Sequence, residues 1–517
     1  ARRVRSPGQL PESLGLVEYG PQVNFPNPWR GGTWRLRDVM DYERVASDAI
    51  LEYCATHRED VLRNMLAKAR ASIAAAAPGE GYRIPMAQRD PATARALAAL
   101  LVEHGVEVKA DASGDAWVPL AQPYGRFVRE MLEVQRFAEV KLVPGKEIVA
   151  PYDVTAWSLP LSMGVTVEKG ALPQGLRPWG AVGPVEAPPA GTKAFALGPS
   201  SPERWKVVAQ ARKGGEVSFL PKAEGALPAG TVVLDAAAAQ SAARVAADLG
   251  LDLVPLAALP EGAARLRAPR VGLYKPWLAS MDEGWTRFLL ERYGFAPVTL
   301  DNAAIRAGKL SAKVDVVVLP DVEKEVLAIG KPKREEGEMK YFPEPRPEHA
   351  GGLGKEGAAA LREFVEGGGT IVALSSSSEY LIEELQLPVR NALARVKPDE
   401  FLCPGSLVRI EVDSTHPVTF GLPPWTPAFL NEPFAFQTAM PGAEMTRRVL
   451  ASYPSEARDV LVSGWIRGEE KLVRNAAAVA LTYGKGKIVL LGFRAQHRAQ
   501  TNATFPFLFN ALAWSVM

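Results

Sequence analysis

Residues that bind metals or form disulfides are scarce in this sequence. Its 517 residues include only two cysteines, Cys54 and Cys403, and five histidines. The cysteines lie far apart and form no Cys-x-x-Cys pair, which argues against a zinc knuckle and a disulfide framework. His104 and Glu107 match His-x-x-Glu spacing, but a zinc site needs a further converging ligand. We interpret His104 as a helix C-terminal residue and expect no metal site in this chain.

Long apolar runs and an excess of one charge are also missing. No apolar run approaches the roughly 18 residues that span a bilayer, so we expect no membrane span. The 60 basic and 58 acidic residues leave a net charge of +2, which gives no electrostatic case for nucleic acid or an anionic membrane. The first segment, ARRVRSPGQL, lacks the apolar region of a signal peptide and an initiator methionine. We expect a processed chain or one that begins at an internal point.

The length predicts about three or four domains, and the pattern of elements predicts an α/β protein. Residues 1–78 are expected to form an irregular arm and one long helix over residues 35–77. Two successive β-α-β modules are expected at residues 79–165 and 166–267. Residues 268–517 are expected to form a doubly wound, flavodoxin-like domain.

One order of elements recurs three times along the chain. An expected strand is followed by a proline-containing loop, a helix, a glycine cap and another strand, starting at residues 82–85, 193–197 and 271–274. This order is typical of parallel β-α-β units, so we expect parallel sheets. Residues 170–192 and 330–356, rich in proline, glycine or charge, are expected to be a linker and a long exposed loop.

The last domain is organised around residues 357–388. A helix there ends on three glycines, a short apolar strand covers residues 370–374, and four serines at 375–378 precede the next helix. A strand, tight turn and helix present a reactive group at the carboxyl edge of a sheet. Here the turn offers only hydroxyl groups, and no histidine lies near them in sequence to activate them. The candidates for a catalytic role are Ser375, Ser376 and Ser377, with His497 as their base.

Two other segments follow expected strands of the same domain and carry polar and aromatic side chains. They are residues 271–285 and 492–501. Small-molecule sites favour this position, although such aromatics also wedge a helix onto a sheet and such polar loops also cap helices. The candidate ligand-binding residues are Tyr274, Lys275, Trp277, Asp282, Glu283, Trp285, Arg494, Gln496, His497 and Arg498.

Several segments together resemble large bacterial proteins of one family. Those proteins carry a carboxypeptidase A-like zinc metallopeptidase domain, followed by a long C-terminal region that ends in a class I glutamine amidotransferase-like domain. One of these segments is PQVNFPNPWRGGTWRLRDVMDYE. All the matching segments, which extend over nearly the whole chain, are residues 21–43, 84–91, 118–133, 151–165, 271–295, 403–423 and 486–505.

The resemblance implies that half of the enzyme lies outside this chain. In such proteins the zinc ligands and the catalytic glutamate precede the segment at residues 21–43, so no peptidase residue carries over. Zinc would belong to that peptidase half, which is the implied partner, in the same polypeptide or as a separate fragment. The helix over residues 35–77 would close the peptidase domain, and the protein would be secreted or periplasmic. The family's nucleophilic cysteine would stand where this chain has serines 375–378, so glutamine hydrolysis is not expected.

The leading hypothesis is a non-catalytic accessory region of a zinc carboxypeptidase-like protein that acts in hydrolysis of peptides or cell-wall peptides. A peptide or cell-wall fragment would be its ligand. One alternative is a free-standing hydrolase that uses the serine turn with His497, which requires a serine–histidine hydrogen bond. Another is a peptide- or sugar-binding protein that uses Trp277, Trp285 and Trp425 as stacking faces. Whether the chain forms a homo-oligomer stays open.

Overall fold

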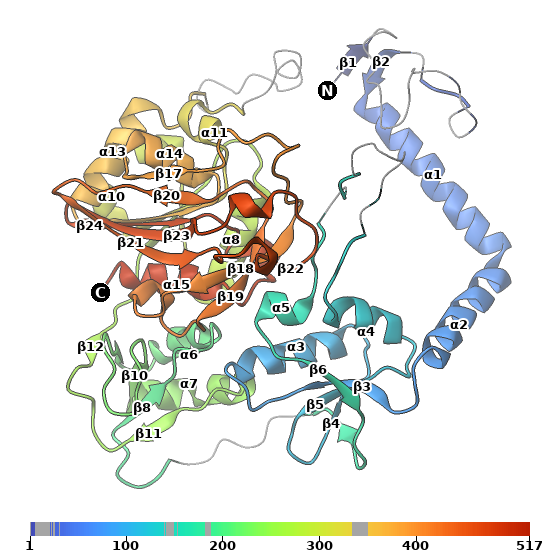
Figure 1. The fold of residues 1–517 in the computed structure, drawn as a ribbon, viewed down its shortest axis with the longest axis horizontal. Helices are drawn as coiled ribbons and strands as arrows, with labels where there is room; N and C mark the ends of the chain where they lie inside the picture. The colour runs from blue at the N-terminus through green and yellow to red at the C-terminus, as the bar shows by residue number, and fades with distance from the viewer. Residues whose placement is uncertain are drawn as a thin grey trace. The chain divides into compact units, whose positions relative to one another are not determined.

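The computed structural model describes most of the chain in two compact units, Ala1–Ala75 and Ala76–Met517. Figure 1 shows the elements of both units. The predicted linker and the predicted exposed loop fall partly outside the described residues. The residues described are 2–5, 21, 23, 26–29, 31–138, 140, 149–151, 154–180, 188–332 and 350–517.

The smaller unit contains a strand pair and two helices. Strands β1 (Arg2–Arg5) and β2 (Gly32–Arg35) pair antiparallel. The helix predicted over residues 35–77 is present as α1 (Leu36–Thr56) and α2 (Arg58–Ala74), which meet at His57, where φ and ψ leave the helical region at −108° and 25°. No residue of α1 is buried. Among the described residues, no helix has the combined length and apolar character needed to cross a bilayer.

The larger unit begins with two small modules that share one topology. In the described chain, each has a five-stranded sheet, in the order β6-β3-β5-β4-β7 and then β11-β8-β10-β9-β12. The elements of the first are β3 (Glu80–Ile84), α3 (Pro91–Glu103), β4 (Lys109–Ala110), β5 (Ala116–Pro119), α4 (Gly125–Leu132), α5 (Leu159–Met163), β6 (Glu168–Ala171) and β7 (Arg177–Pro178). Those of the second are β8 (Ala194–Leu197), α6 (Arg204–Ala211), β9 (Val217–Phe219), β10 (Val232–Asp235), α7 (Ala236–Leu249), β11 (Val254–Leu256) and β12 (Ala264–Arg265).

The prediction of parallel pairing is wrong for these two sheets. Every strand pair in them is antiparallel. Strands β3 and β4 do run in the same direction, because each is antiparallel to β5, which lies between them. The β-α-β order is therefore present in both modules, but the third strand is inserted between the two that the helix connects, as in split β-α-β folds.

The last domain is the doubly wound α/β domain that the sequence predicts. Its parallel strands have the order β14-β13-β15-β16-β24, and an antiparallel extension starts at β23. Its strands are β13 (Val271–Tyr274), β14 (Val298–Leu300), β15 (Val316–Leu319), β16 (Thr370–Leu374), β17 (Val389–Asn391), β18 (Ser406–Val412), β19 (Trp425–Leu430), β20 (Phe436–Thr438), β21 (Met445–Ser452), β22 (Leu461–Ser463), β23 (Ala476–Tyr483) and β24 (Gly486–Leu491). Its helices include α8 (Met281–Arg292), α9 (Asn302–Arg306), α10 (Leu310–Lys313), α11 (Lys324–Ile329), α13 (Gly354–Glu366), α14 (Ser377–Glu384) and α15 (Phe505–Trp514).

Both faces of the parallel sheet are covered, which explains why its strands are continuous apolar runs. Side chains alternate along each strand, so Val316 and Val318 enter one core cluster while Val317 and Leu319 enter another. The first cluster also contains residues of α8, α15 and the second module, and the other contains residues of α11, α13 and α14. Parallel sheets need this cover on both faces, and it leaves the strand ends as the place for a site.

Helix α14 ends in a Schellman motif built on a non-glycine residue. Leu387 N–H donates to the Ile382 carbonyl at 3.0 Å, and Gln386 N–H donates to the Glu383 carbonyl at 3.3 Å. Gln386 has a φ of 52°, in the left-handed region where glycine is the usual residue of this motif.

We predict that Gln386→Gly stabilises the larger unit by about 1 kcal/mol, because glycine adopts this backbone conformation without the steric cost that a side chain brings. The matched control is Glu384→Gly, two residues earlier at the last position of α14, where the backbone is still helical, and it should destabilise by about 0.5–1 kcal/mol. Denaturant-induced unfolding of both variants measures the difference. A destabilised Gln386→Gly variant would contradict the argument.

Candidate functional site

The loops that leave four parallel strands converge at one edge of the sheet. The strand order reverses between β13 and β15, since β14 lies on one side of β13 and β15 on the other. Ligands of doubly wound proteins bind outside the carboxyl ends of the strands at such a switch point. The loops after β13 and β15 therefore flank the position where a ligand site is expected.

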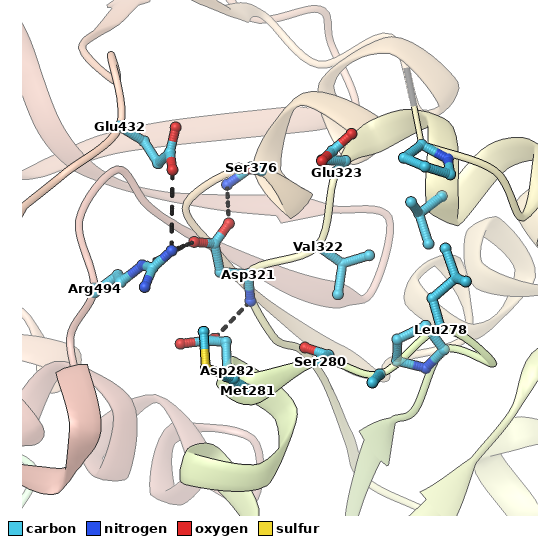
Figure 2. Close-up of a pocket in the computed structure, with 14 residues that line it drawn as sticks. Leu278, Ser280, Met281, Asp282, Asp321, Val322, Glu323, Ser376, Glu432 and Arg494 are labelled. Carbon is cyan, nitrogen blue, oxygen red and sulfur yellow. Dashed lines mark hydrogen bonds and ion pairs between the residues drawn. The ribbon is translucent and has the colours of Figure 1, made fainter. Parts of the chain in front are cut away.

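A cavity of about 690 Å³ lies at this position, within the size range of small-molecule sites. Figure 2 shows its lining residues. The apolar lining comes mainly from the loops after β13 and β15 and from α11, and its members are Pro276, Leu278, Ala279, Met281, Val322, Val326 and Pro332. The polar lining residues are Ser280, Asp282, Asp321, Glu323, Ser376, Glu432 and Arg494.

Asp321 is the centre of the polar side of the cavity. It follows β15 and Pro320, and its Oδ2 accepts from Arg494 Nε at 2.9 Å and lies 2.9 Å from Arg494 Nη2. Its Oδ1 accepts from the backbone N–H of Ser376 at 3.1 Å. Figure 2 shows this carboxylate between the arginine and the serine turn. One side chain thus connects the loops after β15, β16 and β24.

Asp282 lies behind Asp321, at the start of α8. Its Oδ2 accepts from the backbone N–H of Asp321 at 2.7 Å, and its Oδ1 accepts from Gln496 Nε2 at 2.6 Å. The same Nε2 lies 3.0 Å from Thr286 Oγ1. Burial, together with the negative charge of Asp321, raises the pKa of Asp282 to about 6. A fraction of the Asp282 carboxyl groups is therefore protonated near neutral pH.

Glu432 stands at the rim of the cavity, in the loop between β19 and β20. Its Oε1 lies 3.9 Å from Arg494 Nη2, and its side chain is 41% exposed. Burial raises the pKa of Glu432 to about 7, and the charge of Asp321 adds to the effect while Arg494 opposes it. Among the described residues that line the cavity, four are carboxylic acids and one, Arg494, is a cation.

The serine turn keeps the backbone of a nucleophile-bearing turn but not its chemistry. Ser375 has a φ of 45° and is 1% exposed. Its N–H donates to the Leu491 carbonyl at 2.7 Å, and the next N–H, of Ser376, donates to the Asp321 carboxylate. Ser377 Oγ donates to the Pro320 carbonyl and accepts from Val322 N–H at 3.2 Å. In hydrolases with this turn, the N–H of the residue after the nucleophile stabilises an oxyanion. Here that N–H, of Ser376, donates to the carboxylate of Asp321 instead.

The structure does not pair His497 with a serine hydroxyl by a hydrogen bond in the described part of the chain. The imidazole stacks on Phe429 with the ring centroids 3.6 Å apart, and its buried Nδ1 has no hydrogen-bond partner there. Burial lowers the pKa of His497 to about 3, and Arg494 and Arg498 add to the effect. The ring is therefore neutral at physiological pH.

The other residues that the sequence suggested divide between core, surface and cavity. Asp282, Arg494 and Ser376 line the cavity, and Gln496 supports Asp282. Tyr274 is buried, with its hydroxyl donating to Asn302 Oδ1 at 2.7 Å, and Glu283 pairs with Arg287 at 2.5 Å. Side chains that are exposed or partly exposed are Lys275, Trp277, Trp285 and Arg498.

The histidine with metal-like spacing has a structural position. His104 is the C-terminal cap residue of α3, and its Nδ1 lies 2.9 Å from the Leu100 carbonyl oxygen. Within the described ranges, no three or more histidine, cysteine or acidic side chains are grouped to hold a metal ion. Cys403 is buried, and Cys54 is exposed on α1.

Sequence reasoning missed Asp321, Glu323 and Glu432. Asp321 follows β15 directly, so the same strand-end rule that selected residues 271–285 and 492–501 would have found it. Glu432 comes from the antiparallel extension, and only the folding of that sheet brings it to the rim. No local signal in the sequence identifies it.

Comparisons with known proteins give a likeness of fold only. No protein family model matches the sequence, and no curated protein matches it. Solved structures that match include a putative ThuA-like protein from Bacteroides uniformis, which is 14% identical in sequence. The match covers 48% of this chain and 93% of that chain, with a TM-score of 0.28. A glutamine amidotransferase from Thermotoga maritima also matches, with 14% sequence identity. That match covers 48% of this chain and 95% of that chain, with a TM-score of 0.26. Likenesses at this level carry no argument about activity, and the α/β class stands on the strand order itself.

We predict that Arg494→Met destabilises the larger unit by about 2–3 kcal/mol at pH 8 and by less at pH 5. Breaking a largely buried ion pair leaves Asp321 without its cation. The pKa values of Asp282 and Glu432, raised already, should rise further without the guanidinium. A carboxyl group whose pKa is raised in the folded state contributes fully to the free energy of unfolding below its usual pKa. It loses that contribution as the pH rises through the folded-state pKa. The variant should therefore lose more stability at pH 8 than at pH 5.

The control for this variant is Arg448→Met, whose partner Asp413 lies 2.7 Å away in an exposed pair. Its cost should be about 0–1 kcal/mol and nearly the same at both pH values. Urea unfolding at pH 5 and pH 8 provides the measurement. An equal loss at both pH values for Arg494→Met would show that packing, and not charge, explains its effect.

Proposed function

We propose that this chain is a non-catalytic accessory region of a zinc carboxypeptidase-like protein, and that its last domain binds a peptide or cell-wall fragment in the switch-point cavity. The observation that carries the non-catalytic part is the hydrogen bond from Ser376 N–H to the Asp321 carboxylate at 3.1 Å. The zinc chemistry would lie in the peptidase half, and the protein would act outside the cytoplasm, as the sequence resemblance implies.

The occupied N–H group argues against acyl transfer at the serine turn. A serine hydrolase stabilises the oxyanion of its tetrahedral intermediate with N–H donors that are free to reach it. Here the donor next to Ser375 already binds a carboxylate, and a second negative charge beside Asp321 would be repelled. Activation of the hydroxyl also requires a base within hydrogen-bond reach, and the neutral His497 ring stacks on Phe429 instead.

The cavity supports ligand binding without turnover. It combines an apolar wall with a small number of fixed polar groups, which is the usual composition of a binding site. Asp321 and Asp282 are held by hydrogen bonds to backbone and side-chain donors, so the polar side is already ordered before a ligand arrives. An ordered site lowers the entropy cost of binding.

The smaller unit supports a docking role. Helix α1 buries none of its residues, and α2 buries only Ser72 among its described residues. Large apolar side chains on both helices are exposed, and those more than half exposed are Leu36, Met40, Tyr42, Val45, Ile50, Leu51, Tyr53, Leu62 and Met65. Exposed apolar side chains in this number are a feature of surfaces that bind a partner. We propose that this apolar surface packs against the zinc peptidase domain.

We predict that a fluorophosphonate probe, which reacts with activated serines, leaves Ser375, Ser376 and Ser377 unlabelled. The reason is that no base and no free oxyanion donor serve these hydroxyl groups. Mass spectrometry of the intact chain after exposure to the probe provides the measurement, with a known serine hydrolase as the positive control. Labelling that Ser375→Ala abolishes would overturn the non-catalytic reading and favour the free-standing hydrolase.

We predict that the chain forms a stable complex when it is produced together with a carboxypeptidase A-like zinc domain of the proteins that it resembles, with about one zinc per complex. Leu51→Glu should weaken the complex at least tenfold, since it places a charge in the apolar surface. The chain itself should stay folded because Leu51 is 67% exposed. Glu52→Gln, at the next position of α1, is the control. Absence of a complex for the unchanged chain would refute the docking role.

A further inference from the structure

The charges that line the cavity are unbalanced toward acids. Among the described residues that line it, Asp282, Asp321 and Glu432 lie around one guanidinium, that of Arg494. The hydrogen bonds of Asp282 and Asp321 already hold both oxygens of each carboxylate. For Glu432 the nearest cation among the described residues is Arg494, at 3.9 Å, which is beyond hydrogen-bond distance. A cationic group fits this end of the cavity, and an anionic ligand would be repelled.

An apolar stripe continues from the rim of the same cavity along α8. Met281 lines the cavity and is 76% exposed, and Trp285 and Phe288 are 38% and 46% exposed. These residues are at positions i, i+4 and i+7, so they share one face of the helix and lie about 6 and 10 Å beyond Met281 along its axis. The two aromatic rings meet edge to face with centroids 5.9 Å apart. The opposite face, with Thr286 and Leu289, is buried.

We propose that the cavity binds a primary ammonium group of a peptide beside the Glu432 carboxylate, and that apolar side chains of the same peptide lie along the stripe formed by Met281, Trp285 and Phe288. This inference rests on the proposed binding function and names the ligand class of that site. The charge balance of the cavity and the exposed stripe are separate observations, and each selects one half of the ligand.

The chemistry of each contact follows from the residues. An ammonium group that enters the cavity gives up part of its hydration, and a carboxylate within hydrogen-bond distance offsets that loss. The methylene groups that carry it meet Leu278, Val322 and Val326 on the apolar wall. Outside the cavity, the aromatic faces of Trp285 and Phe288 give large contact areas to aliphatic side chains.

Binding of the ammonium group should be coupled to release of a proton. The charged groups that face Glu432 are Asp321, Glu323 and Arg494, and their sum, with burial, raises the pKa of Glu432 to about 7. A bound cation favours the ionised carboxylate and so lowers that pKa. Below pH 7 the ligand must first displace a proton, so its affinity should increase as the pH rises from 5 to 8.

The experiment compares peptides that differ only in the ammonium group. The probes are N-acetyl-Lys-Leu-Leu-amide, its neutral counterpart N-acetyl-norleucyl-Leu-Leu-amide, and Leu-Leu-Leu-amide, whose ammonium is at the N-terminus. We expect calorimetry at pH 8 to give at least about tenfold tighter binding for a peptide with an ammonium group than for the neutral peptide. Comparison of the two ammonium peptides shows whether a side chain or an N-terminus is the better ligand.

Two variants test the two halves of the site separately. Glu432→Gln should remove most of the preference for the ammonium peptide and its pH dependence, while binding of the neutral peptide stays unchanged. Trp285→Ala should weaken all three peptides about tenfold. Matched controls are Glu411→Gln, an exposed glutamate on β18, and Trp425→Ala, an exposed tryptophan on β19; neither should change the affinities.

The outcomes separate this inference from the proposed function. Equal affinity for the neutral and ammonium peptides, or binding that Glu432→Gln and Trp285→Ala leave unchanged, would overturn the ligand class but leave a non-catalytic binding domain. The same holds if none of the peptides binds and none is cleaved. Cleavage of a peptide by the isolated chain would overturn the proposed function itself.

Discussion

The site depends on the Asp321 carboxylate more than on any other group. It is where the loop after β15 meets Arg494 from the loop after β24 and the N–H of Ser376 from the turn after β16. The backbone N–H of the same residue binds Asp282 at the start of α8. Four segments that are distant in sequence are therefore fixed by one residue. Charge-assisted hydrogen bonds of this kind are about twice as strong as neutral ones, and they hold the loops around the cavity in one arrangement.

The same carboxylate determines the electrostatics around it. Burial, with its negative charge adding to the effect, raises the pKa of Asp282 to about 6 and that of Glu432 to about 7. Raised carboxyl pKa values in a cavity are typical of general acids, so they would fit a hydrolase as well as a binding site. The difference lies in the donors. A hydrolase leaves an N–H group open for the oxyanion, whereas here the N–H beside Ser375 is bound to Asp321. In the binding function proposed above, these protonation states would affect the choice of ligand.

Sequence reasoning selected some of the residues that line the cavity but did not predict how they come together. The rule that ligands bind at the carboxyl ends of parallel strands selected Ser376, Asp282 and Arg494, and all three line the cavity. That rule works because a β-α-β pattern is local in sequence. Glu432 was not accessible to it, because its position depends on how the antiparallel extension packs. The same physical limit explains the wrong prediction of parallel sheets in the first two modules: the sequence shows the strands, but not that β5 and β10 are inserted between the strands that flank them.

The serine turn shows how a strained conformation can be kept without chemistry. A non-glycine residue with a φ of 45° costs about 1–2 kcal/mol, and such strain usually accompanies function. The N–H of Ser375 makes the last ladder hydrogen bond between β16 and β24, to the Leu491 carbonyl, and the turn that follows brings the next N–H to Asp321. The hydrogen bond from Ser376 N–H to Asp321 would be lost in a straight continuation of β16, and a buried donor without a partner costs about 1–3 kcal/mol. The strain is therefore offset by the contacts that close the cavity. In this domain the turn connects the sheet to the loop after β15 through backbone hydrogen bonds.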